Sequence, residues 1–118
     1  MKIKIIIATH KKYWMPEDSV YLPVHVGAEG KYREDGSALD LGYVKDNTGE
    51  NISEKNANYC ELTGLYWAWK NLDAEYIGLA HYRRHFCAKG AKGNKQDCVL
   101  TYNQAKELLG ESDILLPK

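Results

Sequence analysis

Apolar residues concentrate in short runs along this chain, and several of the runs predict strands. Residues 2–8 are rich in β-branched side chains and almost continuously apolar after Lys4, which is typical of a central strand in a parallel sheet covered on both faces. Residues 77–80 form a second run that we also expect to be buried on both faces, and residues 112–116 form a third. Residues 21–26 predict a weaker edge strand, because Pro23 cannot donate to a strand ladder.

Between residues 53 and 71 the apolar residues recur with the period of an α-helix, which predicts a helix there. We expect Ser53 to cap the helix, since its side-chain oxygen can accept from the unpaired N–H groups of the first turn. One stripe is apolar and predicts the face that packs on the core: Leu62, Leu65, Tyr66, Trp69 and Leu72. A second face holds small residues, where another backbone could approach closely: Ala57, Gly64 and Ala68. A third face is polar and aromatic, so the helix should be covered on more than one side.

The rest of the chain predicts one short helix and two loops. The helix covers residues 102–109, capped by Thr101 or Asn103 and ended by a glycine. Residues 87–97 are rich in Gly and Lys and predict a flexible loop. Residues 27–41 predict a mobile loop, which is either a lid over a ligand or a plain surface excursion.

Strand, loop, helix, strand, loop, helix and strand follow one another, which predicts a single α/β domain over residues 1–118. Its sheet should be mostly parallel, with flanking helices and right-handed crossovers. Three or four strands make a small sheet for this class. We therefore expect the N-terminal portion of a larger fold, or a protein that completes itself by association.

Composition narrows the class of protein and its compartment. The formal net charge is zero, so no overall basic field favours nucleic acid as a partner. The three cysteines are odd in number and widely spaced, which disfavours a disulfide framework and favours the cytoplasm. The apolar run at the N-terminus is too short for a signal peptide or a membrane span. Association with the inner face of the membrane stays open.

Polar and basic residues directly follow two of the predicted strands. These residues are Thr9, His10, Lys11, His81, Tyr82, Arg83 and Arg84. In open α/β sheets, ligands bind outside the carboxyl ends of the strands. We therefore expect both groups to belong to one binding site.

Arg83 and Arg84 carry planar, permanently charged donor forks that suit phosphate or carboxylate. Strict strand alternation would point them to opposite faces, so that only one would reach a ligand. A plainer interpretation is that one of them pairs with Glu61 or Glu75 and the other is solvated.

A polar turn precedes the long predicted helix and runs from Asp46 through Asn47 to Asn51. Backbone N–H groups at a helix start can hold an anion or a ribose hydroxyl, so this turn is a weak candidate for a binding feature. Such turns precede many helices, and Asp46 is equally compatible with a role in forming the turn.

The common catalytic motifs are absent. The sequence has no Walker loop and no GxGxxG, GxSxG or HExxH pattern. A zinc site is conceivable from four residues: His81, His85, Cys87 and Cys98. These lack a CxxC pair, and the two arginines between the histidines would repel a cation.

No Asp-x-Asp follows an apolar strand, where it would hold a metal on a nucleotide diphosphate. Arg83 and Arg84 occupy the analogous place and can stabilise the charge of a leaving diphosphate instead of Mg²⁺ or Mn²⁺. We therefore expect no cofactor and no metal site, with a divalent metal as the disfavoured alternative.

Several stretches together resemble a known bacterial family, number 4422 among domains of unknown function. They are KIKIIIATHKKYWMP, YLPVHVGAEGK, GYVKDNTGENISEKNANYCELTGLYWAWKN, YIGLAHYRRHF and DILLPK. Members of this family are encoded with capsular and exopolysaccharide biosynthesis genes and are regarded as glycosyltransferases. The resemblance implies a GT-A-like N-terminal half, of the nucleotide-diphospho-sugar transferase type.

By this resemblance, the chain would move a sugar from a nucleotide donor, a UDP-sugar, to a growing capsular, exopolysaccharide or lipopolysaccharide chain, free or lipid-linked. The nucleotide would contact Thr9, His10, Lys11, Asp46, Asn47 and Asn51. The diphosphate would contact His81, Tyr82, Arg83 and Arg84. The catalytic base stays unassigned, because family members are longer and the acceptor half should lie in the part missing here. The alternatives are a non-catalytic nucleotide- or glycan-binding module and a structural subunit of a polysaccharide-assembly complex.

Overall fold

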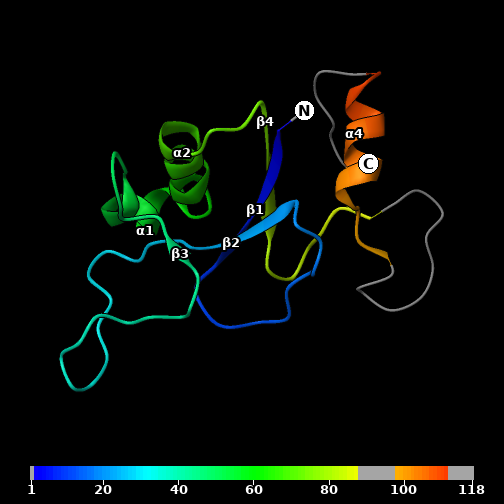
Figure 1. Ribbon diagram of the computed structural model, residues 1–118. Helices are drawn as coiled ribbons and strands as arrows, with labels where there is room; N and C mark the ends of the chain where they lie inside the picture. The colour runs from blue at the N-terminus through cyan, green and yellow to red at the C-terminus, as the bar shows by residue number, and fades with distance from the viewer. Residues whose placement is uncertain (1, 88–97, 112–118) are drawn as a thin grey trace.

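The computed structural model describes residues 2–87 and 98–111. These residues form a four-stranded parallel sheet in the order β3-β2-β1-β4, with helices on both faces (Figure 1). The strands are β1 (Ile3–Thr9), β2 (Tyr21–His25), β3 (Val44–Lys45) and β4 (Tyr76–His81). The helical elements are η1 (Ser53–Lys55), α1 (Asn56–Tyr59), α2 (Leu62–Asn71) and α4 (Tyr102–Leu109). The parallel α/β prediction is confirmed. The strand expected at 112–116 and residues 88–97 of the expected flexible loop lie outside the described residues.

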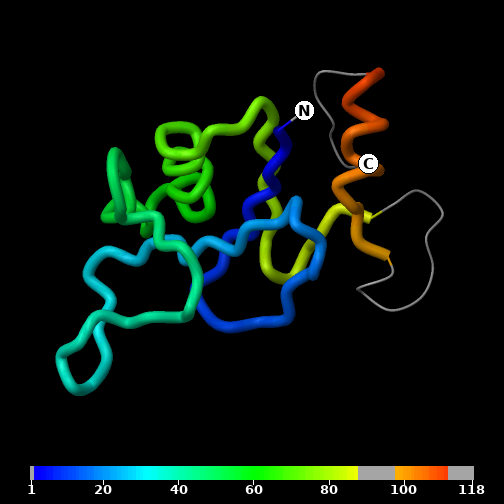
Figure 2. Tube along the Cα trace, in the orientation of Figure 1, coloured from blue at the N-terminus to red at the C-terminus, as the bar shows by residue number. Residues whose placement is uncertain are grey.

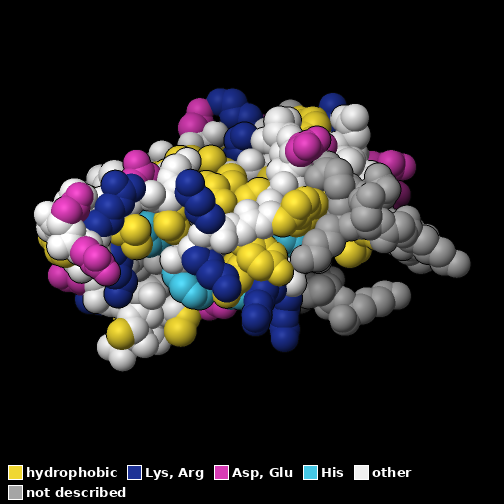
Figure 3. All heavy atoms as spheres, turned by 90° about the horizontal axis from the view of Figure 1, so that it is seen from below, with side chains coloured by type: hydrophobic (Ala, Val, Ile, Leu, Met, Phe, Trp, Pro, Cys, Tyr) yellow, Lys and Arg dark blue, Asp and Glu magenta, His cyan; other side chains and the backbone are white. Residues whose placement is uncertain are grey.

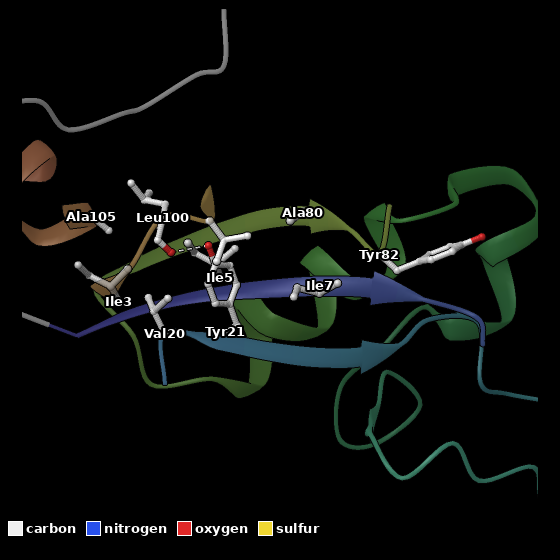
Figure 4. Close-up of a cluster of buried hydrophobic side chains, with 10 residues drawn as sticks. Ile3, Ile5, Ile7, Val20, Tyr21, Ala80, Tyr82, Leu100 and Ala105 are labelled. Atoms are coloured by element: carbon white, nitrogen blue, oxygen red, sulfur yellow. Dashed lines mark hydrogen bonds between the residues drawn. The ribbon is translucent and has the colours of Figure 1, made fainter. Parts of the chain in front are cut away.

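β1 is a central strand whose side chains alternate between two cores. Ile3, Ile5 and Ile7 belong to the core on the α4 side, which Figure 4 shows in close-up. Ile6 and Ala8 belong to the core on the α2 side. β1 is therefore covered on both faces, as its continuous apolar run predicts.

β2 pairs with β1 along its whole length, whereas β3 adds only two residues on its other side. These two pairs are Val24–Val44 and His25–Lys45. Within the described part of the chain, Pro23 has no strand on its outer side. The proline thus lies where the sheet has an open edge, as predicted, although the short β3 makes β2 the second strand in the order.

β4 occupies the other end of the strand order, next to β1. Ile77, Gly78 and Leu79 are half-buried and only Ala80 is buried. The expectation that this strand is buried on both faces is therefore wrong for the described residues, in which no further strand pairs with its outer edge.

The long helix expected between residues 53 and 71 is broken into η1, α1 and α2. The break lies at Cys60, whose φ of 52° is in the left-handed region that few residues other than glycine adopt. The Asn56 side chain donates to the Cys60 carbonyl oxygen at 2.7 Å. Asparagine side chains compete with the helical hydrogen bonds of the backbone in this way, and the turn separates α1 from α2.

α2 packs on the sheet through a different face from the apolar stripe. Its buried residues are Thr63, Gly64, Trp67 and Ala68. In the predicted core stripe, Leu62 is 50% exposed and Trp69 is 65% exposed, so the prediction is wrong for these two residues. Leu72 of the same stripe does pack against the core on the α2 side. Gly64 explains the difference, because a Cβ atom there would stand 2.6 Å from Val26 Cγ1. The close approach expected of the small-residue face is confirmed at this glycine.

α4 begins with a capping box. The Thr101 hydroxyl oxygen accepts from the Gln104 N–H at 3.3 Å, and the Gln104 side chain accepts from the Thr101 N–H at 2.8 Å. Gly110 is the last cap residue, so both predicted ends are confirmed. Neither α4 nor any other helix in the described parts is long and apolar enough to cross a membrane.

The segment 26–43 leaves the sheet between β2 and β3 and turns back as a hairpin, which Figure 2 shows extending away from the strands. Tyr32 pairs with Ala38 in an antiparallel bridge, and the Arg33 N–H donates to the Ser37 carbonyl at 2.8 Å. The structure thus shows a surface excursion here, and closure of this segment over a ligand stays a prediction.

Candidate functional site

All four strands are parallel, so their carboxyl ends lie along one edge of the sheet. The residues that end them are Thr9, His25, Lys45 and His81. Figure 3 looks at this end of the molecule, and Lys, Arg and His side chains gather across its middle. The two polar strand ends that the sequence singles out therefore meet at one place.

Tyr82 is the centre of an aromatic cluster at this edge. Its ring lies 5.4 Å from the His10 ring and 5.1 Å from the Tyr13 ring, both in edge-on contact. The His81 ring lies 4.3 Å away at a tilt of 35°. Tyr82 is only 5% exposed and belongs to the same buried cluster as the isoleucines of β1. Figure 4 shows it at the carboxyl end of the sheet. We call Tyr82 and its neighbours His10, Lys11, Tyr13, His81 and Arg83 the Tyr82 cluster.

Two cations approach the same tyrosine ring. Lys11 Nζ lies 5.4 Å from the centroid of the Tyr82 ring, and Arg83 Cζ lies 5.9 Å from it. Lys11 also lies 5.8 Å from the Tyr13 ring. These distances suit cation–π attraction, which can hold long side chains near the ring while their donors face solvent.

His81, Tyr82, Arg83 and Arg84 form a tight turn. The His81 N–H donates to the Arg84 carbonyl at 3.2 Å and the Arg84 N–H donates to the His81 carbonyl at 2.9 Å. The Arg83 N–H donates to His81 Nδ1 at 3.2 Å. β4 ends at His81, so the two arginines lie in a turn and the alternation of side chains along a strand does not apply to them. The prediction that they point to opposite faces assumed a strand that continues to Arg84.

Both arginines are exposed, and neither forms an ion pair with a carboxylate of the described residues. The expected pairing with Glu61 or Glu75 is therefore not observed. Glu75 instead accepts from the Lys2 N–H at 3.0 Å, at the opposite end of the sheet. Arg83 and Arg84 thus have guanidinium groups available for a ligand.

Thr9 has a buried side chain, whereas the side chains of His10 and Lys11, which follow it, are exposed. Thr9 is 1% exposed, and its hydroxyl donates to the Lys11 carbonyl at 2.5 Å and accepts from the Lys11 N–H at 3.2 Å. Its side chain shapes the turn after β1, as serine and threonine hydroxyls do in such turns. His10 and Lys11 are exposed and present their side chains at the edge.

Asp46 is completely buried, and its carboxylate accepts four hydrogen bonds. The Gly27 N–H donates to Oδ2 at 2.8 Å and the Ala28 N–H donates to Oδ1 at 3.1 Å. The Ser53 hydroxyl donates to Oδ1 at 2.5 Å and the Thr63 hydroxyl to Oδ2 at 2.7 Å. Asp46 therefore ties β3 to the start of the hairpin, to η1 and to α2.

The other turn residues also make local bonds. Asn51 Oδ1 accepts from the Ser53 N–H at 3.1 Å. Ser53 itself makes no side-chain cap, because its hydroxyl is used by Asp46 and by the Glu29 N–H. The cap predicted for Ser53 is therefore wrong, and Asn51 bonds to the start of η1 instead. Asn47 is half-buried and donates to the Glu29 carboxylate at 3.2 Å.

His25 is a buried group that the sequence analysis did not single out. It is 1% exposed, and its Nδ1 atom has no hydrogen-bond partner. Burial is the main cause that lowers the pKa of its imidazole below the usual value. The available signal was a single histidine at the inward-facing end of an apolar run, in step with Tyr21 on alternating positions.

The donor set at this edge does not fit a metal ion. Among residues 2–87 and 98–111, no three His, Cys, Asp or Glu side chains lie where they could hold one. The four residues of the conceivable zinc site all fall in these ranges and form no such group. Asp46, a carboxylate at the edge, is fully occupied by the four donors of its own fold.

Open α/β sheets bind ligands outside the carboxyl ends of their strands, and the basic and aromatic residues of this sheet lie at that edge. The chain belongs to the family described as a domain of unknown function, DUF4422, whose model matches residues 4–118. The resemblance stated from the sequence is thereby confirmed.

A solved structure, the apo form of the bifunctional glycosyltransferase WbbM, is similar to this chain with a TM-score of 0.64 and 36% sequence identity. The similarity covers 80% of this chain and 16% of that protein, so the chain spans only a small part of its length. Among curated proteins, none matches. The likeness to a glycosyltransferase supports the expected GT-A-like architecture.

Proposed function

We propose that this chain is the donor-binding part of a glycosyltransferase that takes a sugar from a nucleotide donor, a UDP-sugar. The acceptor would be a growing capsular, exopolysaccharide or lipopolysaccharide chain, and the reaction would take place in the cytoplasm, at the inner face of the membrane. Family membership and the 36% identity to part of a glycosyltransferase support the class of enzyme. The observation that carries the donor site is the pair of exposed arginines beside Tyr82, which form no ion pair with a carboxylate in residues 2–87 and 98–111.

The turn formed by His81, Tyr82, Arg83 and Arg84 would bind the diphosphate. The hydrogen bonds between His81 and Arg84 fix this turn at the end of β4. Guanidinium groups bind phosphate oxygens through paired N–H donors and carry a permanent charge. They would stabilise the charge that grows on the diphosphate as the sugar leaves, and Lys11 adds a third cation.

The nucleoside would lie across the strand ends toward β3. Thr9, His10 and Lys11 end β1, and Asp46, Asn47 and Asn51 follow β3. From β3 to β4 the sheet spans three strand spacings, about 14 Å, which an elongated ligand could bridge. Within this group, Thr9 and Asp46 would act by holding the backbone, because their side-chain oxygens are already bonded inside the protein.

A non-catalytic nucleotide-binding module is the second candidate, and the state of Asp46 favours it. Asp46 is the buried carboxylate among the described residues, and its oxygens accept four hydrogen bonds. A general base needs a free lone pair directed at the substrate. Turnover of a UDP-sugar by this chain would decide for the enzyme. Binding without turnover is expected both of the module and of a donor-binding part that lacks its acceptor half.

The test is calorimetric titration of the chain with UDP, once in EDTA and once with Mn²⁺. We expect binding in EDTA. Arg83→Ala and Arg84→Ala should each weaken it about 10- to 100-fold, since a hydrogen bond between charged groups contributes about 1.5–3 kcal/mol. The matched control is Arg33→Ala, which removes the same side chain from the exposed hairpin (Figure 2) and should bind UDP as the wild type does.

Three results would contradict the proposal. Binding only with Mn²⁺ would move the phosphate contacts from arginine to a metal. Unchanged affinity in both site variants would remove the arginines from the donor site. Absence of UDP binding under both conditions would reject a donor site in this chain.

A further inference from the structure

His25 stands at a weak point of the sheet. It ends β2, opposite Thr9 of β1 on one side and Lys45 of β3 on the other. β3 is joined to β2 only through the pairs Val24–Val44 and His25–Lys45, and the Asp46 N–H adds one bond to the His25 carbonyl at 3.1 Å. We call these contacts the β2–β3 pairing. One of the two residue pairs and the Asp46 N–H bond therefore involve His25.

The surroundings of the imidazole are unsuited to a proton. The ring is 1% exposed, and a proton on Nδ1 would create a buried donor without an acceptor. Four titratable groups act on the pKa of the ring: Asp46 raises it, whereas Lys45, His10 and Lys31 lower it. Asp46 opposes the effect of burial, but its oxygens already accept four hydrogen bonds.

Release of β3 would also affect the hairpin 26–43. Its first residues, Gly27 and Ala28, are held by the Asp46 carboxylate, which follows β3 directly. Farther on, Tyr43 contacts Tyr13 of the Tyr82 cluster, where the Tyr43 hydroxyl donates to the Tyr13 carbonyl at 3.3 Å. Release of β3 would therefore change the wall of the candidate site as well as the edge of the sheet.

We propose that His25 makes the carboxyl edge of the sheet sensitive to protons: protonation of its ring breaks the β2–β3 pairing and releases β3 together with the hairpin 26–43. At neutral pH the ring is uncharged and the β2–β3 pairing is intact, which we call the closed form. In mild acid the ring gains a proton in the opened form, where water solvates it, and the open form becomes populated. The device does not depend on which ligand the edge binds.

Amide hydrogen exchange tests this inference on two bonds of the same edge. The Asp46 N–H donates to the His25 carbonyl and reports on the β2–β3 pairing, whereas the Ile5 N–H donates to the Val20 carbonyl at 2.8 Å and reports on the contact between β1 and the start of β2. Between about pH 7.5 and 5.5, the protection factor of Asp46 should fall about tenfold more than that of Ile5. One pH unit below the ordinary histidine pKa of about 6.5 contributes about that factor.

The variant His25→Gln keeps a polar side chain that does not titrate, and it should lose this difference. His10→Gln is the matched control, since it removes an exposed histidine from the same edge and should keep the difference. Equal protection of Asp46 at both pH values in the wild type would overturn the proposal, and so would the same fall in His25→Gln.

A titration of the histidine rings by NMR guards against a variant that fails to fold. In the wild type, the His25 ring should titrate below its ordinary range, and the fall in Asp46 protection should lie between about pH 6.5 and that lower midpoint. A His25 ring that titrates at or above about 6.5 would overturn the inference without any variant. UDP binding at about pH 7.5 tests the proposed function separately, because the edge is closed there.

Discussion

Replacement of Asp46 by asparagine is the sharpest test of how this fold is held together. Each carboxylate oxygen of Asp46 accepts from one backbone N–H and one hydroxyl: Ala28 and Ser53 on Oδ1, Gly27 and Thr63 on Oδ2. An amide replaces one of these oxygens by an NH₂ group. The hydroxyl on that side can rotate and accept from the amide, whereas the backbone N–H cannot.

The expected cost follows from this count. One backbone N–H loses its acceptor in a buried place, which costs about 1–3 kcal/mol, and the remaining bonds no longer go to a charged oxygen. The relief of an unpaired buried charge offsets part of the loss. We expect Asp46→Asn to lower the free energy of unfolding by about 2–4 kcal/mol, which corresponds to about 10 °C in the midpoint of a domain of this size.

Thermal and urea unfolding measure this change, with an unaltered dependence on urea concentration as the sign that the native fold is retained. Asp35→Asn is the matched control. Asp35 also accepts a backbone N–H and a hydroxyl, both from Ser37, but in full exposure to water. It should unfold at nearly the wild-type temperature. If Asp46→Asn and Asp35→Asn unfold at the same temperature and urea concentration, the argument from the buried carboxylate is refuted.

Two further predictions concern the cores. Gly64→Ala should destabilise the protein by about 1–3 kcal/mol in urea unfolding, because the new Cβ would stand 2.6 Å from Val26 Cγ1; a wild-type midpoint would show that α2 does not pack this closely. Tyr21 donates to the Leu100 carbonyl at 2.5 Å, and burial raises the pKa of its hydroxyl to about 12. The unfolded chain loses this proton near pH 10, so the contribution to stability is complete below that pH and is lost as the pH rises through about 12. Tyr21→Phe should lack this alkaline loss, and identical alkaline profiles for variant and wild type would contradict the assignment.

The sheet could be predicted from the sequence because one rule governs it. A continuous β-branched run has to be covered on both faces, and β1 is. The helix faces could not be ranked in the same way, since apolarity alone favoured the stripe with Trp69. The shape of the side chains decides which face of α2 packs on the sheet. Gly64 allows α2 to approach Val26, and Trp69 is left exposed to solvent. The break at Cys60 depends on a side-chain bond from Asn56, for which residue periodicity gives no signal.

In the candidate site, too, some features could be predicted from the sequence and others could not. Parallel strands bring their carboxyl ends to one edge, so the meeting of His10 with Tyr82 follows from the strand assignments. The orientation of Arg83 does not follow from them, because it depends on a turn that begins at His81, the last residue of the strand. The isolation of His25 depends on the absence of an acceptor within reach, which requires coordinates.

The pairing of β1 with β4 also bears on how the chain folds. Lys2 and Glu75, beside these strands, are 73 residues apart in the sequence. Contacts of such long range slow folding, because a large loop must close before they form. During synthesis, the isoleucines of β1 emerge long before β4 does, and one edge of that strand is left without its neighbour. Exposed strand edges of this kind invite association between chains, so expression at low temperature should favour the folded form.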